Sequence, residues 1–512
     1  MKLAAIDLGS NSIHMIVVAV DPETGAFHVI DREREMVKLG SGTFKSGRLG
    51  EDAVRQAIET MDRLAALAQR HGATEVLAVA TSAIREAKNG RELLDVVERR
   101  TGVAIRVIDG TAEAELIWRG VGHAVDLDRE RVLTIDVGGG SVEMIVGDAR
   151  RIRLAESLPL GVQRLRDLFA GVDPLPWARR EELTAHVRAT AGPTLARAAT
   201  AGFDVVLGTS GTVLALGLAA IRARGADPWS VLDGQIVTRQ ELSDLASQLF
   251  DMDAAARARV SGVDDRRADT IHLAAGLLVT LLELARVDRL RLSGATLREG
   301  LVVEWLARRG HGVAPADVRR ESVTELLARL GQAHDAHVAH VARLALALFD
   351  GTQRIHGLGP VERELCEHAA RLSDLGRGIS HLGHEHLAFH LIRGGGLRGF
   401  TIGEVDLIAL AARYHRKGNP KPRHAHFAEL DTAERQVVKV LAGLIRLADG
   451  LDRGRTGAVT GVQCDIDRHR VRVTATGGPE AMLEVQAAQK NLQLLTRALD
   501  RAIEIRLLPL GA

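Results

Sequence analysis

Hydrophobic positions in the first 310 residues alternate between short apolar runs and longer segments with one apolar face. The runs at 3–6, 13–20 and 76–79 have the length of buried strands, whereas residues 51–71 repeat apolar side chains at helical spacing. Further strands are expected at 105–108, 132–135, 142–146 and 204–207, and a further helix at 111–123. Alternating strands and helices predict an α/β protein.

One pattern occurs twice in this part of the chain. An apolar strand is followed by Asp-x-Gly with a further Gly or Ser, and then by a second strand, first at residues 7–12 and again at 136–141. The repetition predicts a duplicated fold with two facing lobes. A third glycine-rich loop, at 208–212, follows a strand and precedes an apolar helix.

The composition of these three loops suits phosphate binding. Glycine lets the backbone come close to a ligand and turns several amide N–H groups towards it, and Ser, Thr and Asn add neutral donors. A single such loop is more often a structural turn, but three loops, two with strand-borne aspartates, favour an anion site. The candidate substrate-binding residues are Gly9, Ser10, Asn11, Ser12, Gly138, Gly139, Gly140, Ser141, Gly208, Thr209, Ser210, Gly211 and Thr212.

Carboxylates among phosphate-binding loops indicate a bridging cation, because carboxylate and phosphate repel each other. Asp136 and Glu143 are the candidate ligands, and Mg²⁺, with Mn²⁺ as an alternative, is the cation whose oxygen preference they fit. Their odd separation would place them on opposite faces of one strand, but the intervening glycine turn removes that constraint. The alternative for Glu143 is a solvated strand carboxylate.

The overall composition describes an ordinary globular protein. The 512 residues are 46% hydrophobic and 26% charged, and the length suggests about three or four domains. Two cysteines, Cys366 and Cys464, exclude a disulfide framework and indicate a reducing cytoplasm. We expect no signal peptide, and no apolar run reaches the ~18 residues of a membrane span. A net charge of +1 gives no reason to expect nucleic-acid binding, so any anion site must be local.

Several segments resemble the exopolyphosphatase and guanosine pentaphosphate phosphatase family. They are residues 4–12, 80–89, 108–117, 135–143, 267–271 and 297–301. The family belongs to the actin-like and sugar-kinase superfamily. The resemblance therefore implies an actin-like (ribonuclease H-like) two-lobed core, with lobe I at 1–125 and lobe II at 126–310.

The resemblance also implies catalytic roles. The general base falls on Glu113, with Glu115, two residues along the same helix, as the competing choice. Arg85 corresponds to a guanidinium that grips phosphate oxygens at two points. The alternative for Arg85 is a salt bridge to Glu86 or to Glu113.

The same resemblance implies the remaining ligands. Asp136 and Glu143 hold the metal with Asp7 nearby, and Arg267 contacts substrate. In the expected reaction Glu113 deprotonates an in-line water that attacks a terminal phosphate.

The expected function is that of an exopolyphosphatase, which releases orthophosphate from inorganic polyphosphate. The alternative is a guanosine pentaphosphate 5′-phosphatase of the stringent response, since both activities use the same residues. Residues 81–89 and the Glu113 segment argue against an actin-fold kinase or ATPase. The presence of Glu113, Asp136 and Glu143 together argues against a non-catalytic sensor of guanosine penta- or tetraphosphate. A homodimer is the expected assembly.

The last 200 residues predict two further domains. Residues 315–455 are helical, hold most of the 20 histidines, and resemble the HD phosphohydrolase domain at 337–341, 372–376 and 447–449. Ser373 stands where that family's paired histidine belongs, and serine is a poor ligand. We therefore expect a metal-poor, inactive domain, whose segments 381–386 and 413–417 line an anion path or a domain interface, or form a solvated basic face.

The final segment, 456–512, predicts a small α+β appendage. Alternating positions near 459–462, 471–473 and 482–485 suggest strands, followed by a helix at 488–502 and a strand at 503–507.

Overall fold

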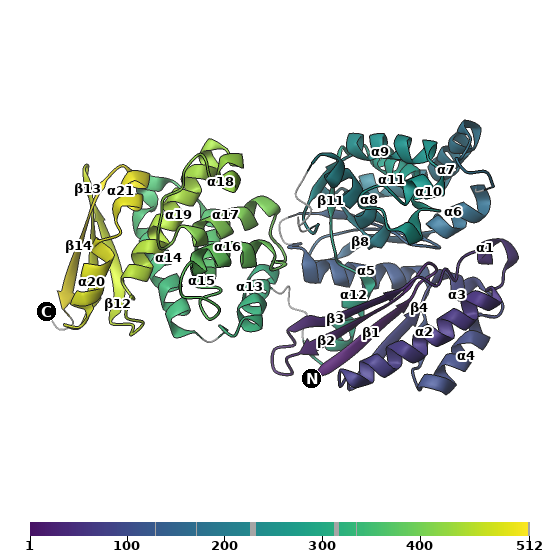
Figure 1. Cartoon of the computed structure of the whole chain (residues 1–512), viewed down its shortest axis with the longest axis horizontal. Helices are drawn as coiled ribbons and strands as arrows, with labels where there is room; N and C mark the ends of the chain where they lie inside the picture. The colour runs from purple at the N-terminus through teal and green to yellow at the C-terminus, as the bar shows by residue number, and fades with distance from the viewer. Residues whose placement is uncertain (128–129, 170, 226–231, 312–316, 334, 510–512) are drawn as a thin grey trace. The chain divides into compact units, whose positions relative to one another are not determined.

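The structure, a computed structural model, describes the chain except residues 128–129, 170, 226–231, 312–316, 334 and 510–512. It forms two compact units, Met1–Val318 and Arg319–Ala512, each with its own core (Figure 1). Among the described residues, no helix combines the length and the apolar character that crossing a bilayer requires.

Two sheets organise the first unit. The first sheet has the order β3-β2-β1-β4-β5, with β1 (Lys2–Leu8), β2 (Ile13–Val20), β3 (Phe27–Glu35), β4 (Glu75–Ala80) and β5 (Ile105–Val107). The second has the order β10-β11-β9-β6-β7-β8, with β6 (Val132–Val137), β7 (Val142–Gly147), β8 (Ile152–Leu158), β9 (Val205–Thr209), β10 (Ile236–Thr238) and β11 (Arg289–Leu292).

The two sheets repeat one topology. In each, three antiparallel strands are joined to two further strands that run parallel to the first. β10 is an antiparallel addition to the second sheet. The duplicated two-lobed core predicted from the repeated loops is confirmed, as is the actin-like fold that the resemblance implied.

Helices cover both faces of each sheet (Figure 1). Their bounds are α1 (Thr43–Ser46), α2 (Glu51–Arg70), α3 (Ser82–Glu86), α4 (Gly90–Thr101), α5 (Gly110–Ala124), α6 (Val162–Phe169), α7 (Trp177–Ala201), α8 (Ser210–Ala223), α9 (Arg239–Asp251), α10 (Ala254–Arg257), the 3₁₀ turn Asp265–Arg267, α11 (Ile271–Ala285) and α12 (Leu297–Arg308). α2 shows the predicted pattern, since Ala57, Met61, Leu64 and Ala68 are buried at helical spacing against the first sheet.

α5 and α12 share a core with strands of both sheets. Their close approach requires glycine, because a Cβ on Gly300 would lie 1.8 Å from the Leu116 carbonyl oxygen and one on Gly120 would lie 2.2 Å from that of Thr296. The predicted lobe II, residues 126–310, includes α12. In the structure α12 packs mainly on α5 and also contacts β1, and both of these elements lie in the predicted lobe I.

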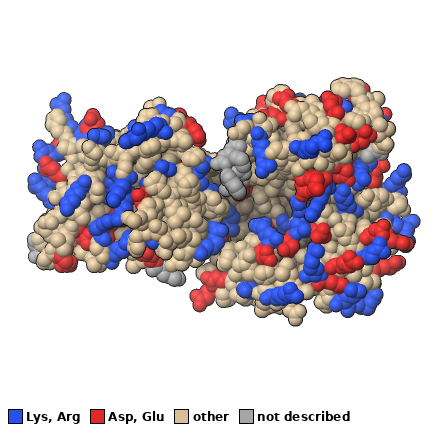
Figure 2. Space-filling view, in the orientation of Figure 1, with Lys and Arg blue, Asp and Glu red and all other residues tan. Residues whose placement is uncertain are grey.

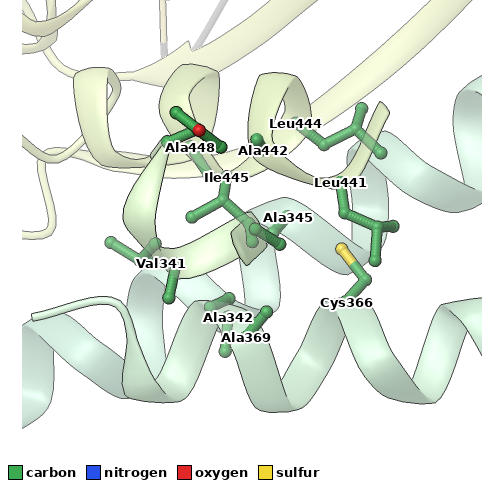
Figure 3. Close-up of a cluster of buried hydrophobic side chains, with 14 of the residues drawn as sticks. Val341, Ala342, Ala345, Cys366, Ala369, Leu441, Ala442, Leu444, Ile445 and Ala448 are labelled. Carbon is green, nitrogen blue, oxygen red and sulfur yellow. The ribbon is translucent and has the colours of Figure 1, made fainter. Parts of the chain in front are cut away.

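The second unit is a helical domain followed by a small sheet. Its helices are α13 (Val318–Arg329), α14 (Ala336–His356), α15 (Pro360–Leu372), α16 (His384–Arg393), α17 (Ile402–Arg413), α18 (Ala425–Glu429), α19 (Thr432–Gly450), α20 (Ala481–Gln489) and α21 (Gln493–Leu499). The sheet has the order β12-β13-β14, formed by β12 (Val459–Ile466), β13 (Arg470–Gly477) and β14 (Ala502–Pro509). Small side chains such as Ala345, Ala369 and Ala442 let α14, α15 and α19 pack closely (Figure 3).

The strand expected at 482–485 is wrong. These residues lie in α20, where Ala481, Val485 and Ala488 are buried while Met482 and Leu483 are exposed. The burial follows helical spacing, and the short apolar run alone does not distinguish the two periods. The helix expected at 488–502 is divided between α20 and α21.

Charged side chains of both signs are interspersed over the visible face of each unit (Figure 2). This distribution agrees with the net charge of +1.

Candidate active site

Two equivalent hairpin turns form the base of a cavity in the first unit. In the turn after β1 the amide of Gly9 donates to the carbonyl of Ser12 at 3.1 Å, and after β6 the amide of Gly138 donates to that of Ser141 at 3.0 Å. The same four-residue turn therefore closes both copies of the repeated pattern.

The two turns meet closely enough to exclude side chains. A Cβ on Gly139 would lie 2.8 Å from the amide nitrogen of Asn11, and one on Gly140 would lie 2.1 Å from Oγ of Ser82. Ser10 Oγ is 2.9 Å from Ser82 Oγ, so the first turn is also tied to α3. The glycines place backbone of both lobes around one small space.

Asp136 and Glu143 lie directly opposite each other across the β6–β7 hairpin. Cross-strand partners share a face of the sheet, so the two carboxylates point the same way despite their odd separation. Thr209 Oγ1 donates to Asp136 Oδ2 at 2.6 Å, and Ser157 Oγ donates to Glu143 Oε1 at 2.7 Å. Both carboxylates are therefore positioned.

Four carboxylates converge on the cavity, namely Asp7, Glu113, Asp136 and Glu143. Burial raises the pKa of Asp7 to about 6, and burial together with the charge of Asp136 raises the pKa of Glu143 to about 8. Burial likewise raises the pKa of Asp136, and burial with the charge of Glu143 raises that of Glu113. Asp7 Oδ1 is buried and has no hydrogen-bond partner among the described residues. Such a set fits a hard divalent cation, which takes oxygen ligands and offsets clustered negative charge.

Glu113 lies in the first turn of α5, which Asp109 caps by accepting from the amide of Ala112 at 2.8 Å. Its side chain is buried and lines the cavity, whereas Glu115 is exposed. The geometry therefore favours Glu113 over Glu115 as the base.

Arg85 holds Glu113 rather than lining the cavity. Its Nη1 donates to the carbonyl of Ile108 at 2.6 Å and to Glu113 Oε2 at 3.3 Å. Glu86, the other expected partner, instead accepts from Arg164 at 2.7 Å. The phosphate-gripping role of Arg85 stays a prediction.

The third loop contributes its C-terminal half. Ser210, Gly211 and Thr212 line the cavity, and Arg267 Nη1 donates to Thr212 Oγ1 at 3.0 Å. Gly208 and Thr209 lie in β9 and do not line it, although Thr209 bonds Asp136.

The sequence did not single out Arg298 as a site residue. Arg298 lies near the start of α12, lines the cavity, and has no hydrogen-bond partner for its buried Nε among the described residues. Burial lowers its pKa, against the nearby charges of Glu299 and Asp7. Arg298 lies within segment 297–301, which resembles the family, and this was the feature of the sequence that could have identified it. The neighbouring residues do not indicate which side of α12 faces the cavity.

The cavity measures about 120 Å³. Typical ligand pockets span ~300–1,000 Å³, so it suits one end of a substrate rather than a whole nucleotide. The predicted residues that line it are Asp7, Gly9, Ser10, Asn11, Ser12, Glu113, Asp136, Gly138, Gly139, Gly140, Ser141, Glu143, Ser210, Gly211, Thr212 and Arg267, and those that the prediction omitted are His14, Thr81, Ser82, Ile117, Val137, Thr296, Leu297 and Arg298.

The anion path expected in the second unit is wrong for two of its histidines. His384 is 1% and His415 is 0% exposed, so neither contributes to a basic surface. Ser373 is also buried, and its Oγ donates to the carbonyl of Ala370 at 2.9 Å.

Comparisons with known proteins identify relatives of the chain. Residues 16–309 match the Ppx/GppA phosphatase family, and residues 318–494 match the Ppx/GppA phosphatase, domain III. A guanosine-5′-triphosphate,3′-diphosphate pyrophosphatase of Vibrio vulnificus is 29% identical over 448 residues, which cover 87% of this chain and 86% of the relative.

Two solved structures resemble the chain over part of its length. An exopolyphosphatase from Cytophaga hutchinsonii is 28% identical with a TM-score of 0.56, and a Ppx/GppA family member from Aquifex aeolicus is 27% identical with a TM-score of 0.52. Each match covers 61% of this chain and 99% of the solved chain. With both family models matched in order over most of its length, the chain belongs to the Ppx/GppA phosphatase family and is a phosphoanhydride hydrolase.

Proposed function

We propose that the chain removes the terminal 5′-phosphate of guanosine 5′-triphosphate 3′-diphosphate. The observation that carries the reaction type is the small cavity in which two interlocked glycine turns face four carboxylates, of which Glu113 and Glu143 are buried. A cavity of this size admits the end of a phosphate chain, which supports cleavage at the terminal anhydride.

The chain's own residues supply alignment and proton transfer. Amides of the two turns bind the terminal phosphate, Arg298 and Arg267 offset its charge, and Glu113 accepts the proton of an in-line water. Arg85 keeps Glu113 oriented.

Asp136 and Glu143, with Asp7, are the residues that would hold Mg²⁺ or Mn²⁺. When bound, the ion neutralises charge on the transferring phosphoryl group.

Coverage favours the guanosine nucleotide as substrate. The Vibrio vulnificus relative, named for that substrate, matches 87% of this chain, including most of the second unit, whereas the Cytophaga hutchinsonii exopolyphosphatase matches 61%. That second likeness keeps inorganic polyphosphate as the other candidate. A long polymer would be favoured by a basic surface formed by segments 381–386 and 413–417. His384 and His415 are buried and cannot contribute to that surface.

The test is a side-by-side turnover assay on guanosine 5′-triphosphate 3′-diphosphate, long polyphosphate and ATP. We expect the highest kcat/KM on the guanosine nucleotide. A higher kcat/KM on long polyphosphate would establish the exopolyphosphatase function instead, and turnover of ATP alone would refute both proposals.

A further inference from the structure

A second cluster of metal-ligating side chains lies in the second unit, independent of the hydrolase site. Asp374 follows α15, His384 begins α16, and His415 lies two residues beyond α17. One potential ligand atom from each residue lies within 4.8 Å of the others, and all three side chains are buried.

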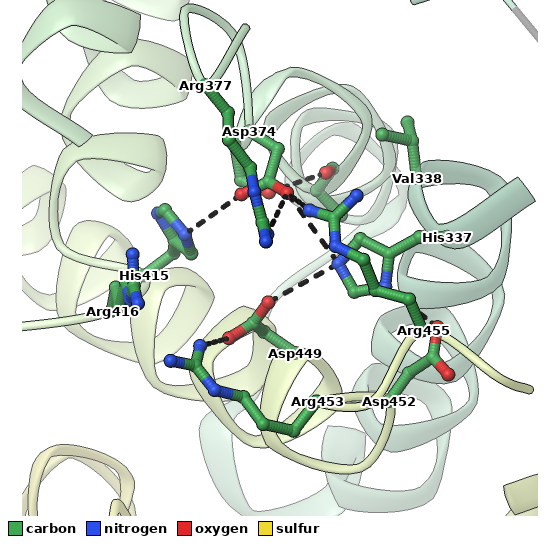
Figure 4. Close-up of polar contacts among 12 residues, drawn as sticks. His337, Val338, Asp374, Arg377, His415, Arg416, Asp449, Asp452, Arg453 and Arg455 are labelled. Atoms are coloured by element: carbon green, nitrogen blue, oxygen red, sulfur yellow. Dashed lines mark hydrogen bonds and ion pairs between the residues drawn. The ribbon is translucent and has the colours of Figure 1, made fainter. Parts of the chain in front are cut away.

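The donor atoms converge. Asp374 Oδ1 is 3.2 Å from Nε2 of His384 and 3.7 Å from Nε2 of His415. Figure 4 shows the His415 ring directed at Asp374. Neither Nε2 has a hydrogen-bond partner among the described residues, although the two rings are 1% and 0% exposed. A buried polar atom without a hydrogen-bond partner destabilises the fold, so two such atoms at one point indicate a ligand.

The opposite ring nitrogen of His415 is oriented as in metal sites, because its Nδ1 lies 2.6 Å from the carbonyl oxygen of Ala412. His384 Nδ1 lies 3.3 Å from the carbonyl oxygen of His381 and also 3.3 Å from Nη1 of Arg416. An Nδ1–H that donates to a carbonyl leaves the lone pair on Nε2, which is the second-shell arrangement of metal-bound histidine.

The other side of Asp374 is neutralised by arginine. Arg455 pairs with Asp374 Oδ2, and Arg377 Nη1 lies 3.2 Å from the same oxygen (Figure 4). Oδ1 is therefore the oxygen left to face the two imidazoles. His337 lies on the arginine side of Asp374, because its Nε2 is 3.7 Å from Oδ2 and 3.5 Å from Asp449 Oδ1.

We propose that Asp374, His384 and His415 bind a divalent transition-metal ion such as Zn²⁺, Fe²⁺ or Co²⁺. Two imidazoles and one carboxylate suit these ions, whereas Mg²⁺ prefers all-oxygen sites such as the first unit's carboxylates. The site replaces the histidine missing at position 373 with two histidines from distant parts of the sequence.

The test is a Co²⁺ titration of the full-length, tag-free, chelator-treated protein in excess Mg²⁺, followed by visible absorption and by elemental analysis. We expect one bound Co²⁺ with ligand-field bands. His384→Gln and His415→Gln should weaken binding by at least the ~10-fold that loss of even an outer-shell partner costs.

Two controls make the result specific. His390 lies on the same helix as His384 but is exposed, so His390→Gln should bind Co²⁺ normally. Asp136→Ala, which alters the first unit's acidic cluster, should also leave the bands unchanged. Bands that persist in both cluster variants, or absence of binding, would overturn the proposal.

Wild-type protein provides a further measurement in case the variants do not fold. X-ray absorption of the Co²⁺-loaded protein should show scattering from two imidazoles. A shell of oxygen atoms alone would overturn the site.

Discussion

At the scale of single residues, the sequence predicts residue types better than their direction. Asp136, Glu143 and the loop residues were predicted from the glycine-rich motifs, and Glu113 and Asp7 from the resemblance to a family. The structure gathers most of them around one cavity. Arg298 was missed, and Arg85 lies behind Glu113, because the direction of a side chain depends on the packing of α12 and α3 rather than on neighbouring letters.

Glu113→Gln should reduce kcat by a factor of ~10² to 10⁴, the usual contribution of a positioned general base. Substrate affinity should persist, because the change removes a negative charge near phosphate. Single-turnover kinetics and equilibrium binding would measure the two effects. The matched control is Glu115→Gln, which alters an exposed carboxylate on the same helix and should leave kcat unchanged. The reverse pattern would assign the base to Glu115.

The contribution of Glu143 to the stability of the metal-free protein should fall as pH rises from about 4.5 to about 8. The folded state keeps a proton on Glu143 up to a pKa of about 8, whereas the unfolded chain releases it near 4.5. At this group the folded state thus binds more protons across the window, so Glu143 contributes a decrease in the free energy of unfolding with rising pH. Urea unfolding in chelator would measure the slope, and Glu143→Gln should flatten it. An unchanged slope in that variant would show that Glu143 ionises normally.

At the scale of elements, periodicity and repetition predicted most of the first unit, because each buried strand and amphipathic helix carries its own pattern. The 482–485 segment failed because four apolar-rich residues fit either period until burial separates Val485 from Leu483. The cluster of Asp374, His384 and His415 could not be predicted, since it depends on how α15, α16 and α17 pack.

The interlocked turns predict a specific sensitivity to one methyl group. Gly140→Ala would place Cβ 2.1 Å from Ser82 Oγ, 2.6 Å from the ring of Phe44 and 2.7 Å from Oγ of Ser10 in the other turn, so these side chains must move away. We expect a loss of roughly 1–3 kcal/mol in stability, with reduced turnover.

Gly122→Ala is the matched control, because Gly122 lies within α5 and a Cβ added there would meet Leu127 Cδ1 at 3.5 Å, an ordinary van der Waals contact. That change should stabilise the helix by roughly 0.5–1 kcal/mol. Thermal unfolding and phosphate release would compare the two variants. Equal stability and equal turnover in both would contradict the close contact of the two turns.

At the scale of the whole molecule, the cavity of the candidate active site is lined by residues of the first unit. Every residue that lines the cavity precedes Val318, and the first unit holds three hydrophobic clusters of its own. The Aquifex aeolicus and Cytophaga hutchinsonii structures are matched over 99% of their length by 61% of this chain, so relatives of that size fold as separate chains.

A chain that ends at residue 318 should therefore fold cooperatively and release phosphate from a short substrate such as tripolyphosphate. The same truncation carrying Glu113→Gln distinguishes its own turnover from a contaminant. Circular dichroism during heating and a phosphate-release assay would test both properties. A truncated chain that folds but has no turnover would show that the second unit supplies part of the catalytic site. In that case the removed residues would be needed for catalysis and not for folding, although none of them lines the cavity.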